Sequence, residues 1–237
     1  MASAEGLFGK VLGRFLFRQA TAAVVHEMSP HFRRVELHGE GLRNSGWTAG
    51  DKVQVYLPDE GMRTYTPLGW DEERGTTELL VYAHGDGPGS RWSRALSAGQ
   101  GCQFMGPRRS LVFQKDETVF LFGDETSFAV AHALKTSMRP GAVRAVFEVS
   151  DAGESEDVLR QLDLGESAVV VRALGEEHLG AACESIRRAL EARPNTRVAL
   201  TGRAQSIQWI RVALKRDGLR PPSTVKAYWS VGKKGLD

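Results

Sequence analysis

Short runs in which apolar and polar residues alternate fill the first half of the chain, and Gly, Pro or Asp separates one run from the next. This period of two predicts β-strands. The expected strands are residues 21–25, 33–38, 52–57, 78–83 and 101–105. Strands of this length and spacing favour a small antiparallel barrel. Residues 90–98 predict a short helix that caps the barrel and ends at Gly99.

The second half of the chain follows a different pattern, in which apolar runs alternate with amphipathic helical stretches. The expected strands are residues 119–122, 143–149, 168–171 and 197–200, and the expected helices are residues 127–137, 156–162, 178–192 and 204–217. Alternating strands and helices predict a parallel sheet with helices on both faces. We therefore expect two domains, the barrel in residues 1–115 and an α/β domain in residues 116–237.

An amphipathic stretch precedes the first expected strand. Its apolar residues recur at helical spacing, and its basic residues lie along another face. The apolar positions are Leu7, Phe8, Val11, Leu12, Phe15 and Leu16, and the basic ones are Lys10, Arg14 and Arg18. A membrane-surface role and packing against its own domain both fit this N-terminal helix. We favour packing, because any peripheral helix shows one apolar stripe.

Composition excludes several classes of protein. The 237 residues are 41% hydrophobic and 25% charged, which is ordinary for a globular protein. Cys102 and Cys183 are far apart, and the histidines lack the spacing of metal ligands, so no metal centre is expected. No apolar run reaches the roughly 20 residues that cross a bilayer, and the first residues are unlike a signal peptide. We expect a cytoplasmic protein with no integral membrane insertion and, at a net charge of +2, no nucleic-acid partner.

One cluster of unlike residues lies between the third and fourth expected strands. Arg63 and Tyr65 are two residues apart, so on a strand they share one face. The arginine fork suits a diphosphate, the tyrosine ring can pack on a flat ring system, and the Thr66 hydroxyl can reach a reacting edge. An ordinary barrel strand with a surface arginine explains this cluster alone equally well.

A second cluster runs from His84 to Trp92. It places Gly87, Pro88 and Gly89 directly before a helix expected to start near Ser90. Unpaired amides and the dipole at a helix N-terminus favour a phosphate, and glycine allows its close approach. A tight loop with Ser90 as the helix cap is the alternative. Trp92 fits either the core or the side of an adenine. Together, the two clusters indicate a flavin site.

A third cluster follows the first strand of the expected parallel sheet. It consists of Gly123, Asp124, Glu125 and Thr126, and it opens the next helix. Ligands of such sheets bind at the carboxyl ends of the strands. A G-x-G-x-x-G fingerprint is absent, so this turn predicts a ligand edge without naming the nucleotide. Alternatively, the two acidic residues only cap the helix.

Taken in order, five motifs resemble the siderophore-interacting protein family, FAD-containing ferric-siderophore reductases of the ferredoxin-reductase-like superfamily. The motifs are Arg63 to Thr66, His84 to Trp92, Gly106-Pro107-Arg108-Arg109, Gly123 to Thr126, and Ala227-Tyr228-Trp229-Ser230-Val231-Gly232. The resemblance spans residues 21–234. It implies an antiparallel FAD-binding β-barrel followed by a parallel α/β domain that binds NAD(P)H.

The resemblance also implies a role for each motif. The flavin is held by Arg63, Tyr65 and Thr66, with Tyr65 and Thr66 at its reacting ring. The diphosphate side is carried by His84, Gly87, Pro88, Gly89 and Ser90, with Trp92 nearby. The nicotinamide nucleotide side is lined by Gly123, Asp124, Glu125 and Thr126. The ferric substrate lies toward Lys226, Trp229, Lys233 and Lys234.

Two segments depart from the family pattern. Gly202-Arg203 stands where the family usually has a Gly-Glu pair, and Pro67-Leu68-Gly69-Trp70 follows the Arg63 strand. These departures leave the substrate and the choice between NADH and NADPH open.

The expected function is an oxidoreductase that passes electrons from NAD(P)H through FAD to a ferric siderophore and releases ferrous iron. Residues 201–237 hold eight Lys or Arg against two Asp, and this basic segment also suits docking of an acidic protein. A flavin reductase that exchanges electrons with a ferredoxin or an oxygenase is therefore the alternative. A non-catalytic nucleotide-binding module is the third interpretation. The siderophore and the oligomeric state stay open.

Overall fold

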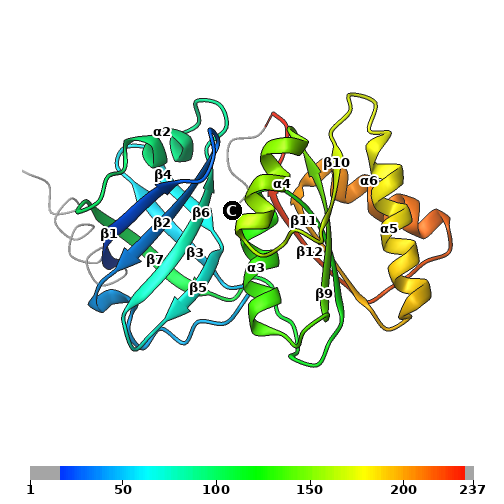
Figure 1. The fold of residues 1–237 in the computed structure, drawn as a ribbon, viewed down its shortest axis with the longest axis horizontal. Coiled ribbons are helices and arrows are strands. Elements are labelled where there is room, and N and C mark those ends of the chain that lie inside the picture. The colour runs from blue at the N-terminus through cyan, green and yellow to red at the C-terminus, as the bar shows by residue number, and fades with distance from the viewer. Residues whose placement is uncertain (1–16, 233–237) are drawn as a thin grey trace, which may run out of the picture. The chain divides into compact units, whose positions relative to one another are not determined.

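The computed structural model describes residues 17–232, and the chain divides into two compact units, Met1–Arg109 and Ser110–Asp237 (Figure 1). This division lies six residues before the boundary after residue 115 that the change in hydrophobic period predicts. Residues 7–16 of the expected N-terminal helix lie outside the described residues, but Arg18, which was expected on the basic face of that helix, is the first residue of a strand. Between residues 17 and 232, no helix has the length and apolar character needed to cross a membrane.

The first unit is an antiparallel seven-stranded sheet in the order β4-β3-β7-β1-β2-β6-β5. The strands are β1 (Arg18–Glu27), β2 (Phe32–His38), β3 (Lys52–Leu57), β4 (Gly61–Tyr65), β5 (Pro67–Asp71), β6 (Thr76–Tyr82) and β7 (Gly101–Arg108). A short 3-10 helix, η1 (Glu40–Leu42), follows β2. Buried Val35, Val55, Leu79 and Phe104 lie in the core of this sheet. The predicted barrel is confirmed.

Two features of the first unit differ from the sequence prediction. Strand β5 was not expected, because Pro67 and Gly69 are poor strand residues. The strand forms because it pairs with β6 and Trp70 packs against the core, with its indole N–H donating to the Leu42 carbonyl at 2.8 Å. The capping helix α2 (Pro88–Ala95) begins two residues before the expected Ser90, with Pro88 in its first turn.

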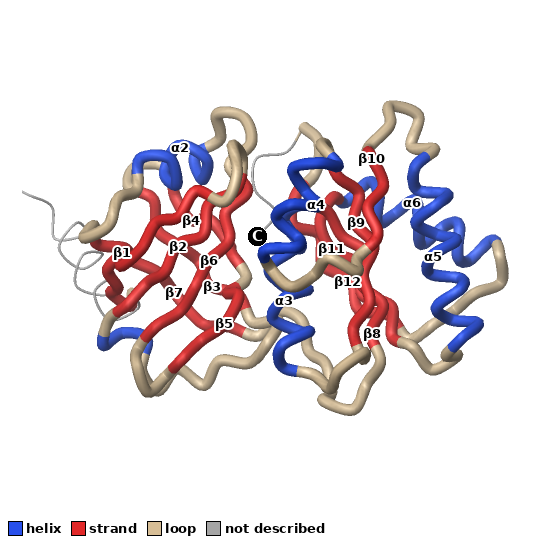
Figure 2. Tube along the Cα trace, in the orientation of Figure 1, coloured by secondary structure: helices blue, strands red, loops and turns tan. Residues whose placement is uncertain are grey.

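The second unit is a five-stranded parallel sheet in the order β10-β9-β8-β11-β12. Its strands are β8 (Val119–Asp124), β9 (Val143–Val149), β10 (Ala168–Val171), β11 (Arg197–Arg203) and β12 (Ser223–Trp229). Helices α3 (Phe128–Ser137) and α4 (Ala152–Gln161) cover one face, and α5 (His178–Ala192) and α6 (Ala204–Arg216) cover the other (Figures 1 and 2). The predicted doubly covered parallel sheet is confirmed. Strand β12 was not expected, since this edge strand is polar and partly exposed.

The strand order fixes where a ligand can bind. All six residues of β8 are buried, as in a central parallel strand. The chain runs from β8 outward to β9 and β10, and then returns to the other side of β8 for β11 and β12. The carboxyl ends of β8 and β11 therefore flank a topological switch point, where open α/β sheets bind their ligands.

Candidate functional site

Arg63 and Tyr65 both face the first turn of α2. On β4 they pair with Val55 and Val53 of β3, so the expected common face is present. A Cβ built on Gly89 would lie 2.8 Å from the Tyr65 hydroxyl oxygen and 3.8 Å from Cγ of Arg63. The structure thus brings the first two sequence clusters together at the N-terminus of one helix.

The charge of Arg63 is available at this position. Its Nη1 donates to two backbone carbonyls, those of Met62 at 2.6 Å and Glu60 at 3.3 Å. Within residues 17–232, no carboxylate forms an ion pair with it. A guanidinium has five N–H donors in a fork that fits phosphate oxygens, so Arg63 suits the diphosphate of FAD.

The two glycines at the start of α2 have different surroundings. Gly87 is the N-cap, has an extended conformation and lacks a side-chain cap. A Cβ at Gly87 would meet nothing within 4 Å, so there is open space beside the start of α2. Pro88 has no N–H, so the first amide that this helix can offer a phosphate is that of Gly89. Gly89 is required because a Cβ would press on Tyr65. Ser90 is the third helical residue, so the alternative that it caps the helix is wrong.

The loop before α2 is held by its own contacts. The Ser90 hydroxyl donates to the His84 carbonyl at 2.8 Å, and the His84 ring stacks on Tyr82 with centroids 4.6 Å apart. The Trp92 ring lies 5.8 Å from that of Tyr65 and packs against the barrel core. Burial raises the pKa of the Tyr65 phenol, which therefore stays neutral at physiological pH. Half-buried Thr66 connects β4 to β5.

The turn after β8 is tightly packed. Asp124 is fully buried and accepts a hydrogen bond from the Thr126 amide at 2.9 Å, which begins the short 3-10 helix η2 (Glu125–Ser127). A Cβ at Gly123 would lie 2.3 Å from Cβ of Ser127, so close packing requires this glycine. Burial raises the pKa of Asp124 to about 6, and hydrogen bonds from Thr126 and Trp229 oppose the rise. The predicted helix-capping role of Asp124 is present.

Trp229 extends from the end of β12 to the same turn. Its indole N–H donates to Oδ2 of Asp124 at 2.6 Å, and the Arg172 guanidinium lies 5.9 Å from the centre of its ring. Among the other expected substrate residues, Lys226 is half-buried on β12. Lys233 and Lys234 lie outside the described residues.

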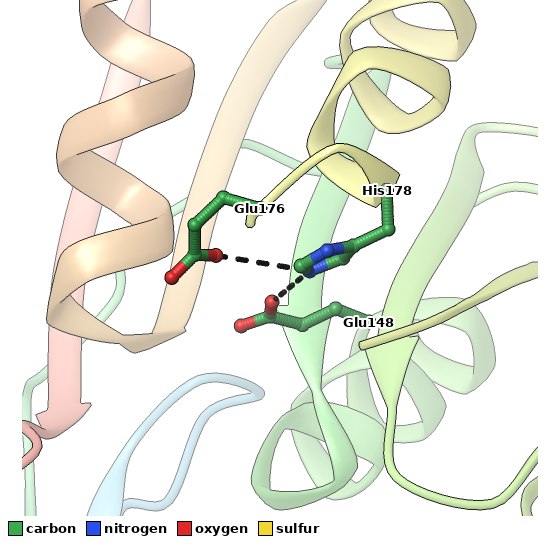
Figure 3. A group of neighbouring side chains, drawn as sticks. All are labelled: Glu148, Glu176 and His178. Carbon is green, nitrogen blue, oxygen red and sulfur yellow. Dashed lines mark hydrogen bonds and ion pairs between the residues drawn. The ribbon is translucent and has the colours of Figure 1, made fainter. Parts of the chain in front are cut away.

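Sequence reasoning missed a charged network at this carboxyl edge. Glu148, near the end of β9, is fully buried, and its Oε2 lies 2.8 Å from Nε2 of His178 (Figure 3). The amide of Ala173 donates to Nδ1 of the same ring at 3.1 Å. Nδ1 is therefore the acceptor, and the neutral imidazole carries its proton on Nε2. One feature of the sequence could have indicated this network: Glu148 is a charged residue within the largely apolar run of residues 143–149.

Two arginines complete the charged network. Arg172 pairs with Glu125 at 3.0 Å, and Arg203 pairs with Glu176 through both guanidinium Nη atoms, one at 2.8 Å. Oxygen and nitrogen atoms of Glu148, Glu176 and His178 lie within 4.8 Å of one another, as metal ligands do. However, the facing His178 nitrogen bears a proton, and both arginines lie within 4 Å of Oε2 of Glu148. The arrangement is an ion-pair network and does not suit a cation.

Comparison with solved structures shows that the chain shares its fold with a ferredoxin reductase and with siderophore-interacting proteins. A ferredoxin-NADP+ reductase from Plasmodium falciparum aligns with a TM-score of 0.67 at 10% identity over 90% of this chain and 96% of that chain. A siderophore utilization protein from T. fusca aligns with a TM-score of 0.72 at 24% identity over 93% and 95%. The siderophore-interacting protein SipS from Aeromonas hydrophila gives 0.74 at 20% identity over 92% and 93%.

The sequence comparisons identify similar proteins more specifically than the fold does. Residues 60–111 match the siderophore-interacting FAD-binding domain, so this match covers both barrel clusters. The NADPH-dependent ferric-chelate reductase of Escherichia coli is 29% identical over 178 residues, which are 62% of this chain and 68% of that protein. The predicted resemblance to siderophore-interacting proteins is confirmed, as is FAD as the cofactor of the barrel.

Proposed function

We propose that the protein is an FAD-dependent oxidoreductase that passes electrons from NAD(P)H to a ferric siderophore and releases ferrous iron. The observation that carries the proposal lies within the matched FAD-binding segment: Arg63, which forms no ion pair among residues 17–232, and Tyr65 face the first turn of α2. The sequence similarity to the ferric-chelate reductase of Escherichia coli supports the choice of acceptor.

In this proposal, the first unit binds and orients the flavin. Arg63 and the first amides of α2 neutralise the diphosphate, while the glycine at position 87 leaves room for it. When FAD is bound, the neutral Tyr65 ring would pack beside the flavin ring, and Thr66 would serve its reacting edge. When bound, FAD supplies the conversion of a two-electron donor into one-electron transfers.

The second unit binds the nicotinamide nucleotide at the carboxyl edge of its sheet. Gly123, Asp124, Glu125 and Thr126 form the turn at the switch point, and Trp229 lies against that turn. Lys226, Lys233 and Lys234 would attract a negatively charged ferric chelate, such as a catecholate complex. Iron leaves after reduction, since hard oxygen ligands hold ferrous ion far less tightly than ferric ion.

The test is anaerobic reduction followed by addition of the acceptor. Purified protein with FAD should lose its yellow colour on addition of NADH or NADPH, and ferric chelates should restore the colour with formation of ferrous iron. A protein that fails to bind FAD supports a non-catalytic nucleotide-binding module instead.

We place the activity in the cytoplasm, where such nucleotides occur and where the buried thiols of Cys102 and Cys183 stay reduced.

A second candidate is a flavin reductase that exchanges electrons with a protein. The basic charge of residues 201–237 favours it, and the fold is shared with the ferredoxin reductase of carbazole 1,9a-dioxygenase, at a TM-score of 0.71 and 16% identity. Rapid reoxidation by a ferredoxin or an oxygenase, with slow reoxidation by every ferric chelate, would select this candidate.

A further inference from the structure

Arg203, the last residue of β11, has its charge neutralised from within the chain. Its Nη1 donates to Oε2 of Glu176 at 2.8 Å, and Nη2 donates to the other oxygen of that carboxylate. The Arg203 side chain is 11% exposed and that of Glu176 is 24% exposed. A guanidinium that pairs with both oxygens of a carboxylate has the geometry that also accepts a phosphate.

The position of Arg203 is that of a ligand contact. Strand β11 lies on one side of β8, and β9 lies on the other. Nη1 of Arg203 is 3.9 Å from Oε2 of Glu148 on β9, so the side chain crosses the carboxyl end of β8. This is the switch point of the sheet, where the ligands of open α/β domains bind.

The carboxylate that occupies this position comes from a strained connection. Glu176 lies between β10 and α5 with φ at 64°, a left-handed conformation that residues other than glycine rarely adopt. Two residues earlier, the Leu174 side chain is fully exposed. Release of Glu176 would therefore relieve backbone strain without removing Leu174 from a core.

The same cluster contains buried polar atoms that lack a partner among residues 17–232. They are Nε of Arg203, Nε of Arg172 and Oε1 of Glu148. Buried donors without an acceptor are unfavourable, and two of these three atoms are guanidinium donors. A phosphate group brings several acceptor oxygens to this cluster. The two guanidinium Nε atoms, which lack a hydrogen bond within the described residues, thus match a phosphate.

We propose that Arg203 binds a phosphate group of the nucleotide donor and that Glu176 is an internal carboxylate which this phosphate displaces. The proposal rests on the proposed function for the identity of the ligand. The phosphate is either the 2′-phosphate of NADPH or the diphosphate that NADH and NADPH share. This phosphate contact would also give a role to Arg203, which stands where the siderophore-interacting protein family usually has a glutamate.

The test measures dissociation constants by titration calorimetry on the full chain with FAD. The ligands are inorganic pyrophosphate, NADPH and NADH, and the variants are Arg203→Gln, Glu176→Gln and the double variant. Removal of the competing carboxylate in Glu176→Gln should lower Kd roughly fivefold. Arg203→Gln should raise Kd by about tenfold or more. In the double variant, Glu176→Gln should no longer tighten binding, because its effect acts through Arg203.

The matched control is the ion pair at the other end of β11. Arg197, its first residue, donates to Glu117 through Nε at 3.0 Å and Nη2 at 2.6 Å. Glu117→Gln should leave every Kd unchanged. Melting temperatures of all variants show whether they are folded. An effect on NADPH alone identifies the 2′-phosphate, and equal effects on both nucleotides identify the diphosphate.

The outcomes separate this proposal from the proposed function. If Arg203→Gln leaves every Kd unchanged, Arg203 is not the phosphate contact, and if Glu176→Gln fails to lower Kd, Glu176 is not displaced. Either result overturns this proposal, and the proposed function is unaffected as long as NAD(P)H still reduces the flavin. If the variants behave as expected but the nucleotides never reduce the flavin, the phosphate contact stands and the oxidoreductase proposal fails. If the parent protein binds none of the three ligands, both are overturned.

Discussion

The indole N–H of Trp229 donates to the buried carboxylate of Asp124 at 2.6 Å and so joins the last strand of the parallel sheet to its first. Asp124 is fully buried, and the negative charges of two other carboxylates, Glu125 and Glu148, also raise its pKa. The indole donor is one of the few groups that favour its charged form. This pair makes the stability of the second unit depend on pH.

Burial raises the pKa of Asp124 from 3.8 to about 6 in the folded protein. Between these values the folded state binds more protons than the unfolded state, so the contribution of Asp124 to stability falls as pH rises from about 4 to 6. Asp124→Asn should remove this part of the pH dependence. Urea unfolding of both proteins at several pH values checks it, and parallel stability curves would contradict the assignment.

Arg63→Ala should weaken FAD binding without unfolding the barrel. The lost charge-assisted contact corresponds to roughly 1.5 to 3 kcal/mol, about 10- to 100-fold in Kd. Flavin fluorescence titration measures this change. Arg74→Ala, an exposed arginine in the turn between β5 and β6, is the control and should bind FAD normally. Unchanged FAD affinity in Arg63→Ala would exclude the arginine from the phosphate site.

The two glycines of α2 should respond differently to substitution. Gly87→Val points its side chain into open space, so we expect weaker FAD binding and an unchanged melting temperature of the apoprotein. Gly89→Ala places a methyl group 2.8 Å from the Tyr65 hydroxyl and should destabilise the apoprotein as well. Equal losses of apoprotein stability in both variants would make Gly87 a structural turn residue only.

Changing Lys226, Lys233 and Lys234 together to Gln should raise KM for ferric chelates and flatten its dependence on salt. Reduction of the flavin by NAD(P)H should not change. Stopped-flow spectroscopy separates the two half-reactions. The control changes the exposed α6 residues Arg211, Lys215 and Arg216. If chelate kinetics stay as in the parent while a protein acceptor reacts more slowly, the electron-exchange alternative gains support.

The sequence predicted most of the elements because their patterns are local. Strand β3 and helix α5 have the predicted bounds, since a strict period of two or 3.6 needs no partner to be recognised. Strands β5 and β12 were missed because one contains Pro67 and Gly69, and the other is a polar edge. Only their neighbours in the sheet make them strands.

The sequence also predicted the local part of the candidate site, but not the contacts between distant segments. A two-residue spacing put Arg63 and Tyr65 on one face, but their approach to Gly89 depends on how α2 folds over the barrel. Glu148, Arg172 and Arg203 meet because three different strands end at one edge of the sheet. No local pattern links residues so far apart in the chain.

The pairing of β11 with β8 and of β12 with β11 also sets an order of assembly during synthesis. Residues 1–109 form a unit with its own core, so the barrel can fold while the rest of the chain is still being made. Asp124 is translated more than a hundred residues before Trp229, and its carboxylate lacks the indole donor until β12 has emerged. The flavin site can therefore form early, whereas the ligand edge of the second unit is completed only after β12 has been synthesised.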